Sequence, residues 1–222
     1  MLIWAALIWM GVHIGIAGSG VREVVAGRVG ERGFRIRFSL ISVAALAFLI
    51  VSFNRADTTP LWFAPEWLRW LLVLAMLPAF MLFVGSLTTP NPTMLGGERG
   101  TPGGLTGVQR ITRHPMLWSF AIWAAVHVVG NGDTASIIFF GAFLITALAG
   151  MPSIDAKLRQ RDPVRWASVA RESSILPFAA IAEGRNKLML GEIGWPVWAG
   201  GTAWVVVLAV HRPVFGVAPV PF

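Results

Sequence analysis

The sequence of 222 residues contains no cysteine and no tyrosine. The chain therefore has no disulfide, no thiolate metal site and no thiol nucleophile, and it lacks the phenol that can serve as a proton donor. Charge is scarce as well, because Asp, Glu, Lys and Arg together make up 13% of the residues, about half the share in an average soluble domain. Any chemistry then depends on the four histidines, a few acids and bases, hydroxyl or backbone groups, or a cofactor.

Long uncharged stretches are what the sequence has instead. Hydrophobic residues make up 55% of the chain, and the mean hydropathy is +0.68. A helix needs about 20 mostly apolar residues to cross the hydrocarbon core of a bilayer. We therefore predict an all-α, polytopic integral membrane protein, a single domain over 1–222 with a bundle of about six transmembrane helices. The predicted spans are 2–18, 38–54, 70–89, 115–130, 134–151 and 193–211, with a kink at Pro78 in the third.

Most Lys and Arg residues lie on one side of these spans. Fifteen of the eighteen fall in the segments after the first, third and fifth spans, and three fall on the other side. Because short cytoplasmic loops carry the excess of Lys and Arg, we predict that those three segments are cytoplasmic and both termini non-cytoplasmic. The net charge of +7 is spread over short loops, which argues against nucleic-acid binding. We expect the first span to be a retained helix and not a cleaved signal peptide.

The connecting segments carry further signals. Residues 90–113 are rich in Gly and Pro, which predicts a mobile, non-helical stretch. The uncharged run 173–182 is too short to span a membrane, which predicts an interfacial or re-entrant piece. Asp162 before Pro163 predicts a helix start, and Asp133 predicts a tight turn whose carboxylate caps the next helix.

The four histidines sort into two depths under this topology. His13 and His114 lie toward the cytoplasmic side, whereas His127 and His211 lie toward the other side. His114 and His127 are thirteen residues apart on one predicted helix, or about 20 Å at 1.5 Å per residue, so they cannot both ligate one haem iron. The pairs that remain are His13 with His114 and His127 with His211. For each histidine, packing within the bundle or at the interface is the alternative to a role in a site.

Three arginines lie near these histidines, namely Arg22, Arg110 and Arg113. A guanidinium pairs with a carboxylate through two parallel hydrogen bonds. These arginines are therefore candidates to hold an anionic group such as a haem propionate. The alternative is that they only reflect the cytoplasmic excess of positive charge.

The stretch RITRHPMLW from Arg110 to Trp118, followed by AAVH ending at His127 and by GNGDTAS over 130–136, resembles the NnrU family of bacterial membrane proteins. The opening GVH at 11–13, the Asn-Pro pair at 91–92 and the Pro-Ser-Ile-Asp exit from the fifth span fit the same pattern. The resemblance covers nearly the whole chain and is closest over 88–155. It implies a location in the bacterial inner membrane.

The resemblance also implies a function. NnrU proteins are similar to the 15-cis-zeta-carotene isomerase of plants and cyanobacteria, an integral membrane haem b enzyme that isomerises a cis double bond in a carotenoid. By matching motif positions, haem b would be held by His13 and His114, with Arg22, Arg110 and Arg113 near it and His127 as a less favoured ligand. The chain would then be a redox-dependent isomerase of a hydrophobic polyene, with membrane lipid as its surroundings. This chain has Ile111 where the isomerase has a cysteine, so a cysteine ligand switch is not expected.

Two other functions stay open at the level of sequence. One is a non-catalytic membrane factor or sensor in nitrite and nitric oxide metabolism, from which the NnrU family takes its name. The other is a membrane methyltransferase that uses S-adenosylmethionine, because isoprenylcysteine methyltransferases also have an Arg-His-Pro motif at a helix start. Those enzymes usually follow the motif with an aromatic residue and a later acidic cluster, whereas this chain has Met116 and no such cluster.

Overall fold

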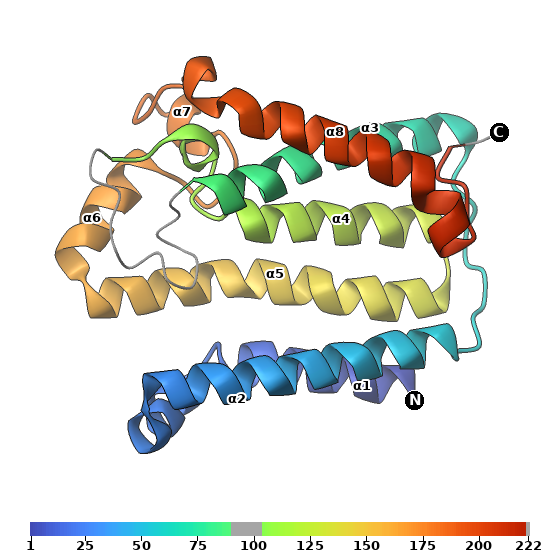
Figure 1. The fold of residues 1–222 in the computed structure, drawn as a ribbon, viewed down its shortest axis with the longest axis horizontal. Helices are drawn as coiled ribbons and strands as arrows, with labels where there is room; N and C mark the ends of the chain where they lie inside the picture. The colour runs from blue at the N-terminus through green and yellow to red at the C-terminus, as the bar shows by residue number, and fades with distance from the viewer. Residues whose placement is uncertain (90–103, 221–222) are drawn as a thin grey trace. The chain divides into compact units, whose positions relative to one another are not determined.

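The computed structural model describes residues 1–89 and 104–220 (Figure 1). These residues form eight α-helices with a π-helical turn η1 and a 3₁₀ turn η3, and they include no β-strand. The helices are α1 (Leu2–Met10), α2 (Val21–Asn54), α3 (Glu66–Thr88), α4 (Pro115–Asn131), α5 (Thr134–Arg161), α6 (Pro163–Glu172), α7 (Ala179–Ala182) and α8 (Leu190–Phe215), with η1 at Gly11–Ile16 and η3 at Gly107–Arg110. Most of the Gly-rich stretch, together with the Asn-Pro pair at 91–92, lies outside the described residues.

The prediction of an all-α membrane protein is confirmed, but the number of spans is confirmed only in part. Four described helices are long and apolar enough to cross a membrane, namely α2, α3, α5 and α8. The first predicted span forms a shorter apolar helix over Leu2–Ile16, and α4 has 17 residues, near the lower limit for a span. All six predicted apolar stretches are helical, but the prediction that each is a full span is not confirmed.

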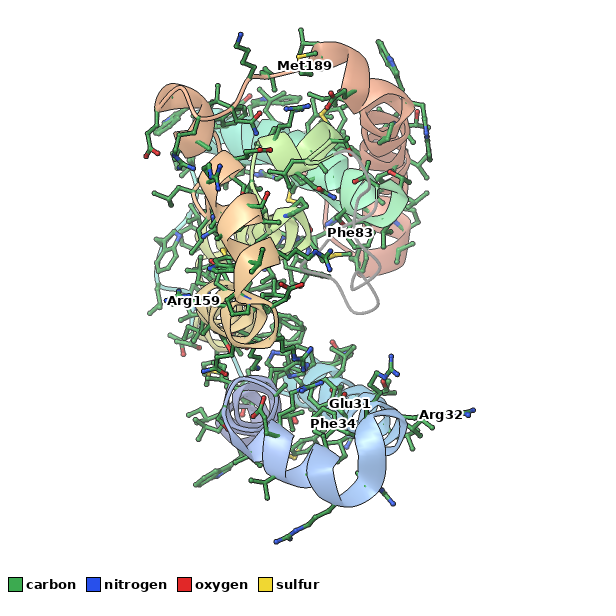
Figure 2. The ribbon with its side chains drawn as sticks, turned by 90° about the vertical axis from the view of Figure 1, so that its left-hand side faces the viewer. Glu31, Arg32, Phe34, Phe83, Arg159 and Met189 are labelled. Carbon is green, nitrogen blue, oxygen red and sulfur yellow. The ribbon has the colours of Figure 1, made fainter. Side chains whose placement is uncertain are left out.

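Two helix breaks in the described chain lie at glycines, whereas the predicted kink at Pro78 stays a prediction. The helix α3 continues through Pro78. Gly30, with φ 75° and ψ 157°, interrupts α2, and Gly194, with φ 44° and ψ −142°, interrupts α8. Both glycines adopt a backbone conformation that L side chains rarely take, which is why the chain changes direction there. Figure 2 shows Arg32, just after the first break, extending away from the chain.

The described chain divides into two compact units. Unit 1 comprises Met1–Ala64 and Ala124–Ser153, and unit 2 comprises Pro65–Trp123 and Ile154–Phe222. The prediction of one domain over the whole chain stays a prediction, and each unit is described by itself below.

Unit 1 packs α1, η1 and α2 with the second half of α4 and most of α5. Aromatic rings form part of its core, since the Phe53 ring lies 4.5 Å from Phe139 and the Trp9 ring 4.7 Å from Phe143. At one end the connection after α2 is clamped to the α4–α5 turn. The backbone N–H groups of Leu61 and Trp62 donate to the carbonyl of Gly132, at 2.8 and 3.1 Å.

The predicted turn at Asp133 is confirmed in detail. Its Oδ1 accepts the backbone N–H of Ser136 at 2.9 Å, which caps the start of α5, and Oδ2 accepts the Ser136 hydroxyl at 2.7 Å. Asp133 also accepts a hydrogen bond from the Thr58 hydroxyl. Gly132 has φ 66°, and a Cβ there would lie 2.2 Å from the carbonyl oxygen of Trp62, so only glycine fits this close approach.

Unit 2 pairs α3 with α8, which run side by side (Figure 1). The two helices approach closely at Gly200, where a Cβ would lie 2.7 Å from Cα of Met81. The Trp204 indole N–H donates to the carbonyl of Val73 at 3.1 Å. The turn η3, the start of α4, α6, α7 and the start of α8 gather at one end of this unit. The predicted start of α6 is confirmed, because Asp162 accepts the backbone N–H of Arg165 at 3.0 Å.

Candidate functional site

His13 lies in the π-helical turn η1, which continues directly from α1. A π-helical turn is rare and occurs frequently at functional sites. The extra residue in the turn shifts the side chains that follow it around the helix relative to a regular α-helix. The apolar sequence of this span gave no sign of the turn. We call the group formed by η1, Trp9 and Phe38 the His13 turn.

The His13 ring is held by one hydrogen bond and two aromatic contacts. Its Nδ1 lies 2.9 Å from the carbonyl oxygen of Trp9. The ring centroid lies 3.9 Å from that of Trp9 and 5.6 Å from that of Phe38. Because a carbonyl oxygen only accepts, Nδ1 is the protonated nitrogen and Nε2 of a neutral His13 carries the lone pair. Nε2 has no hydrogen-bond partner within the part of the chain that the structure describes.

The helix surface opposite the His13 side chain is open, because residues two positions away point to the other side of a helix. Gly11 and Gly15 flank His13, and a Cβ built at either position would meet no atom within 4 Å. Small residues on a helix face allow close approach of another helix or of a flat ligand. The His13 turn therefore combines a nitrogen lone pair with an uncrowded surface on its opposite face.

Arg22 is linked to the His13 turn through aromatic rings. Its guanidinium lies 5.3 Å from the centroid of Phe34, which stacks on Phe38 at 5.7 Å. The same guanidinium donates to Glu31 at 2.8 Å, across the helix break. Arg22 is thus engaged with a carboxylate of this chain.

A second group lies in unit 2 and consists of Arg113, His114 and Asp155, which we call the His114 cluster. The side chain of His114 is fully buried, and those of Asp155 and Arg113 are 5% and 11% exposed. Arg113 donates to Asp155 through Nη2 at 2.6 Å and through Nε at 2.9 Å. Nε2 of His114 lies 2.7 Å from the other carboxylate oxygen. Both carboxylate oxygens therefore have charge-assisted partners.

The residues around this cluster tie the RITRHP motif to the segment after α6. Arg113 donates its backbone N–H to the carbonyl of Ser174 at 3.1 Å. The hydroxyl of Thr112 and the indole N–H of Trp118 both donate to the carbonyl of Ile175, at 2.7 and 2.8 Å. The RITRHP motif thus organises this end of unit 2.

The remaining nitrogen of His114 is enclosed. Nδ1 has less than 1 Å² of accessible surface and no hydrogen-bond partner among the described residues. Because Nε2 faces a carboxylate that already receives Arg113, Nε2 carries the proton and Nδ1 of a neutral ring carries the lone pair. The lone pair of His114 is therefore covered by protein atoms, unlike that of His13.

Arg110 is part of a separate ion pair. It donates to both carboxylate oxygens of Glu192, through Nε at 2.6 Å and Nη2 at 2.9 Å, and to the side chain of Asn186 at 2.9 Å. The hydrogen bond to Glu192 raises the pKa of Arg110 above its ordinary value. Glu192 also accepts the backbone N–H of Gly107 at 3.1 Å, so this pair fastens η3 to the first turn of α8.

The other two histidines lie apart from these groups. His127 stacks on Phe140, with ring centroids 4.7 Å apart. Nδ1 of His211 lies 2.9 Å from the carbonyl oxygen of Val217. His127 belongs to unit 1 and His211 to unit 2, so their predicted pairing stays a prediction, as does that of His13 with His114. The described residues contain no group of three or more His, Cys, Asp or Glu side chains arranged to hold a metal ion.

Sequence reasoning named Arg113 and His114 but missed Asp155. The signal was present, because Asp155 ends the Pro-Ser-Ile-Asp exit from the fifth span. In the sequence, this position carries no expectation beyond its place in the NnrU-like pattern. A lone acid at the end of an apolar stretch, in a chain with eleven acids, is a candidate partner for a buried base.

Comparison with known proteins agrees with this description. The family model described as NnrU protein matches residues 1–219. The chain is 29% identical over 198 residues to the 15-cis-zeta-carotene isomerase, chloroplastic, of Arabidopsis thaliana, and 28% identical over 199 residues to that of Zea mays. These alignments cover 84% and 85% of this chain and 52% of each relative, so the chain spans about half the length of these curated relatives. No solved structure matches it.

Proposed function

The chain belongs to the NnrU family, and from that premise we propose that it is a membrane-embedded isomerase of a hydrophobic polyene. The support is the similarity to two enzymes whose names state action on 15-cis-zeta-carotene. The composition fits such a substrate, because a polyene is soluble in the bilayer and the chain has few groups for acid–base catalysis. We place the protein in the bacterial inner membrane, with both termini on the non-cytoplasmic side.

Haem b is the cofactor that we propose, and the two candidate ligands fit it unequally. A ligating histidine generally donates its other ring N–H to a carbonyl or carboxylate, which fixes the ring and leaves one lone pair for the metal. His13 has this arrangement through Trp9, and its Nε2 has no hydrogen-bond partner among the described residues. His114 donates to Asp155, but its lone pair is enclosed. The structural support therefore rests on His13, and the support for His114 rests on the family motif.

The residues of this chain have distinct tasks in this proposal. Haem, when bound, would supply the redox chemistry that lowers the barrier to rotation about a double bond of the polyene. His13 would present Nε2 to that iron, while Trp9 and Phe38 keep the imidazole ring in place. Arg22 would hold a haem carboxylate only by releasing Glu31, to which it donates a hydrogen bond in this structure.

The first test is the absorption spectrum of the purified full-length protein after haem is supplied. We expect an intense Soret band at one haem per chain in the unaltered protein. His13→Ala should lose it, whereas His127→Ala, which changes a histidine stacked on Phe140, should keep it. No Soret band in the unaltered protein, or an unchanged band in His13→Ala, would contradict the haem proposal.

The second test is conversion of the substrate. Purified protein in vesicles is given 15-cis-zeta-carotene under reducing conditions, and the isomers are separated by chromatography. We expect loss of the 15-cis isomer with the unaltered protein and not with His13→Ala. Haem binding without any conversion would overturn the isomerase and favour a haem-binding sensor or accessory factor.

A further inference from the structure

The segment between α6 and α8 forms neither a span nor a buried plug. It contains one helix of four residues, α7, and the chain returns to the same end of unit 2 to begin α8 (Figure 1). Both α5 and α8, which flank this part of the chain, are long and apolar enough to cross a membrane. The segment is therefore held close to the membrane surface by the helices on either side.

The backbone of this segment is fixed. The N–H of Phe178 donates to the carbonyl of Ile111 at 2.8 Å, and the N–H of Ala180 donates to the hydroxyl of Ser174 at 3.0 Å. Ile175 receives the hydrogen bonds from Thr112 and Trp118 described above. The segment thus presents its side chains in a defined direction.

Two large apolar side chains project outward from this fixed backbone. Leu176 is 62% exposed and Phe178 is 51% exposed, whereas the neighbouring Ala180 is completely buried. Phe178 also has φ 64°, the one non-glycine residue with a positive φ in the described chain. A bulky residue in this conformation is strained, and such strain persists where the surroundings or a function require it. We call Leu176 and Phe178 the apolar edge.

The hydrogen bonds described above hold Phe178 in this conformation, and its side chain and that of Leu176 nevertheless remain exposed. Exposed apolar side chains on a fixed backbone indicate a partner that is apolar where these residues touch it. The charges nearby indicate that the same partner also carries negative charge. Over 156–188 the chain carries seven Lys and Arg residues against three Asp and Glu.

Two of these cations lie on the exposed surface beside the apolar edge in sequence, Arg171 before it and Lys187 after it. Arg185 has a different task, since it donates to the carbonyls of Arg171 and Ser173 at the end of α6. Figure 2 shows Met189, which is 46% exposed, at the outer side of the connection into α8. Apolar and cationic groups thus alternate along one surface-bound segment.

We propose that the apolar edge inserts into the interfacial layer of the membrane, where Arg171 and Lys187 attract anionic phospholipid headgroups. Apolar residues with flanking Lys and Arg are the combination that binds the headgroup and acyl-chain boundary of anionic membranes. The segment would anchor this end of unit 2 in the plane of the bilayer. The proposal does not depend on the isomerase or on haem.

The absence of cysteine from the chain makes the test direct. Single Leu176→Cys and Phe178→Cys variants of the full-length protein are labelled with an environment-sensitive fluorophore. They are reconstituted into vesicles of phosphatidylcholine alone or with about 30% phosphatidylglycerol. Glu183→Cys, at the exposed end of α7, is the matched control for a position that stays in water.

We expect labels at 176 and 178 to be quenched by nitroxide on lipid acyl chains. Iodide in the aqueous phase should quench them about threefold less than it quenches the label at 183. Phosphatidylglycerol should increase the lipid quenching, and Arg171→Gln with Lys187→Gln should remove that increase. Because positions 176 and 178 are labelled separately, the test still gives a result if one of the two variants fails to fold.

Three outcomes would overturn the proposal. Equal iodide quenching at 176, 178 and 183 would place the apolar edge in water. Lipid quenching that is the same with and without phosphatidylglycerol would show that anionic headgroups do not attract this segment. Protection from both quenchers, together with crosslinking between labelled chains, would assign the edge to a contact between two copies of this protein.

Discussion

The His13 turn and the His114 cluster use the same side chain in opposite ways. His13 has one hydrogen bond to a backbone carbonyl and two aromatic neighbours, and its second nitrogen has no partner among the described residues. His114 is fully buried, pairs with a carboxylate that also binds an arginine, and has its second nitrogen enclosed. The difference teaches that two histidines at positions of the family pattern can have very different surroundings within one chain. Each prediction below tests one side of this contrast.

The largest effect is expected from Asp155→Ala, which removes the carboxylate from the His114 cluster. Removing one partner of a buried ion pair leaves an uncompensated charge and costs about 3–5 kcal/mol. We therefore expect a large drop in the thermal midpoint, measured in detergent by near-ultraviolet circular dichroism of the tryptophans. Asp162→Ala is the control, because it removes an exposed helix cap worth about 1 kcal/mol. Equal drops in thermal midpoint for Asp155→Ala and Asp162→Ala would show that the carboxylate of the His114 cluster contributes no more than an exposed helix cap.

In unit 1 the largest effect is expected away from His13, at Gly132. A Cβ in Gly132→Ala would meet the carbonyl oxygen of Trp62, and φ is 66°, so the clamp must shift. We expect a loss of about 1–3 kcal/mol. The control is Gly141→Ala in α5, where a Cβ meets no atom within 4 Å and the change should be neutral or stabilising. Similar thermal midpoints for both variants would show that the clamp is not rigid.

The apolar stretches predict the helices well, but they do not indicate which side chains contact one another. The fourth span was predicted to begin at Pro115, and α4 begins there, because the charge and glycine content change abruptly at that point. The predicted fifth span ended at Met151, yet α5 continues to Arg161. A polar helical extension has no apolar signal, although its residues are good helix formers.

The site divides in the same way. The motif identified Arg113 and His114, but Asp155 is 41 residues away from His114 and becomes its neighbour only through the packing of α5. The π-helical turn at His13 depends on backbone geometry that hydrophobicity does not encode. The exposed strain at Phe178 was invisible for the same reason.

A smaller effect is expected at the partly exposed ion pair of Arg110 with Glu192. Comparing this pair with the buried pair of Arg113 and Asp155 tests how burial changes the contribution of an ion pair in unit 2. The side chains of Arg110 and Glu192 are 23% and 29% exposed. A pair in contact with solvent contributes about 1 kcal/mol or less, and salt screens it. We expect Arg110→Met to lower stability by about that amount at low salt and by less in 1 M salt, whereas the Asp155→Ala effect should persist in salt. If Arg110→Met lowers stability equally at low and high salt, the Arg110–Glu192 pair behaves like the buried pair of Arg113 with Asp155.

His13→Ala should have a modest effect on the stability of the haem-free protein, well below that of Asp155→Ala. The ring makes a single hydrogen bond, and its net contribution is about 1 kcal/mol before the loss of ring contacts is counted. A change in thermal midpoint clearly smaller than that of Asp155→Ala, combined with loss of the Soret band, would assign ligand binding to His13. A change as large as that of Asp155→Ala would instead make His13 a structural residue like His114.

The smallest effect is a pH dependence at Asp133, in the clamp of unit 1. Burial alone would raise the pKa of Asp133, but the hydrogen bonds from Thr58, Ser136 and the Ala135 backbone lower it below its ordinary value. A carboxylate whose pKa is lower in the folded state stabilises the fold above its unfolded pKa of about 3.9, and that contribution is lost as the pH falls through the folded pKa.

Asp133→Asn removes this titration while it keeps an oxygen that can accept the Ser136 N–H. The midpoint of thermal unfolding should therefore fall less steeply between about pH 5 and pH 3 in Asp133→Asn than in the unaltered protein. Asp57→Asn, which changes an exposed acid next to Thr58 in sequence, is the control and should leave the slope unchanged. Parallel curves for all three proteins would show that acid weakens this protein elsewhere, and the His114 cluster would be the next place to look.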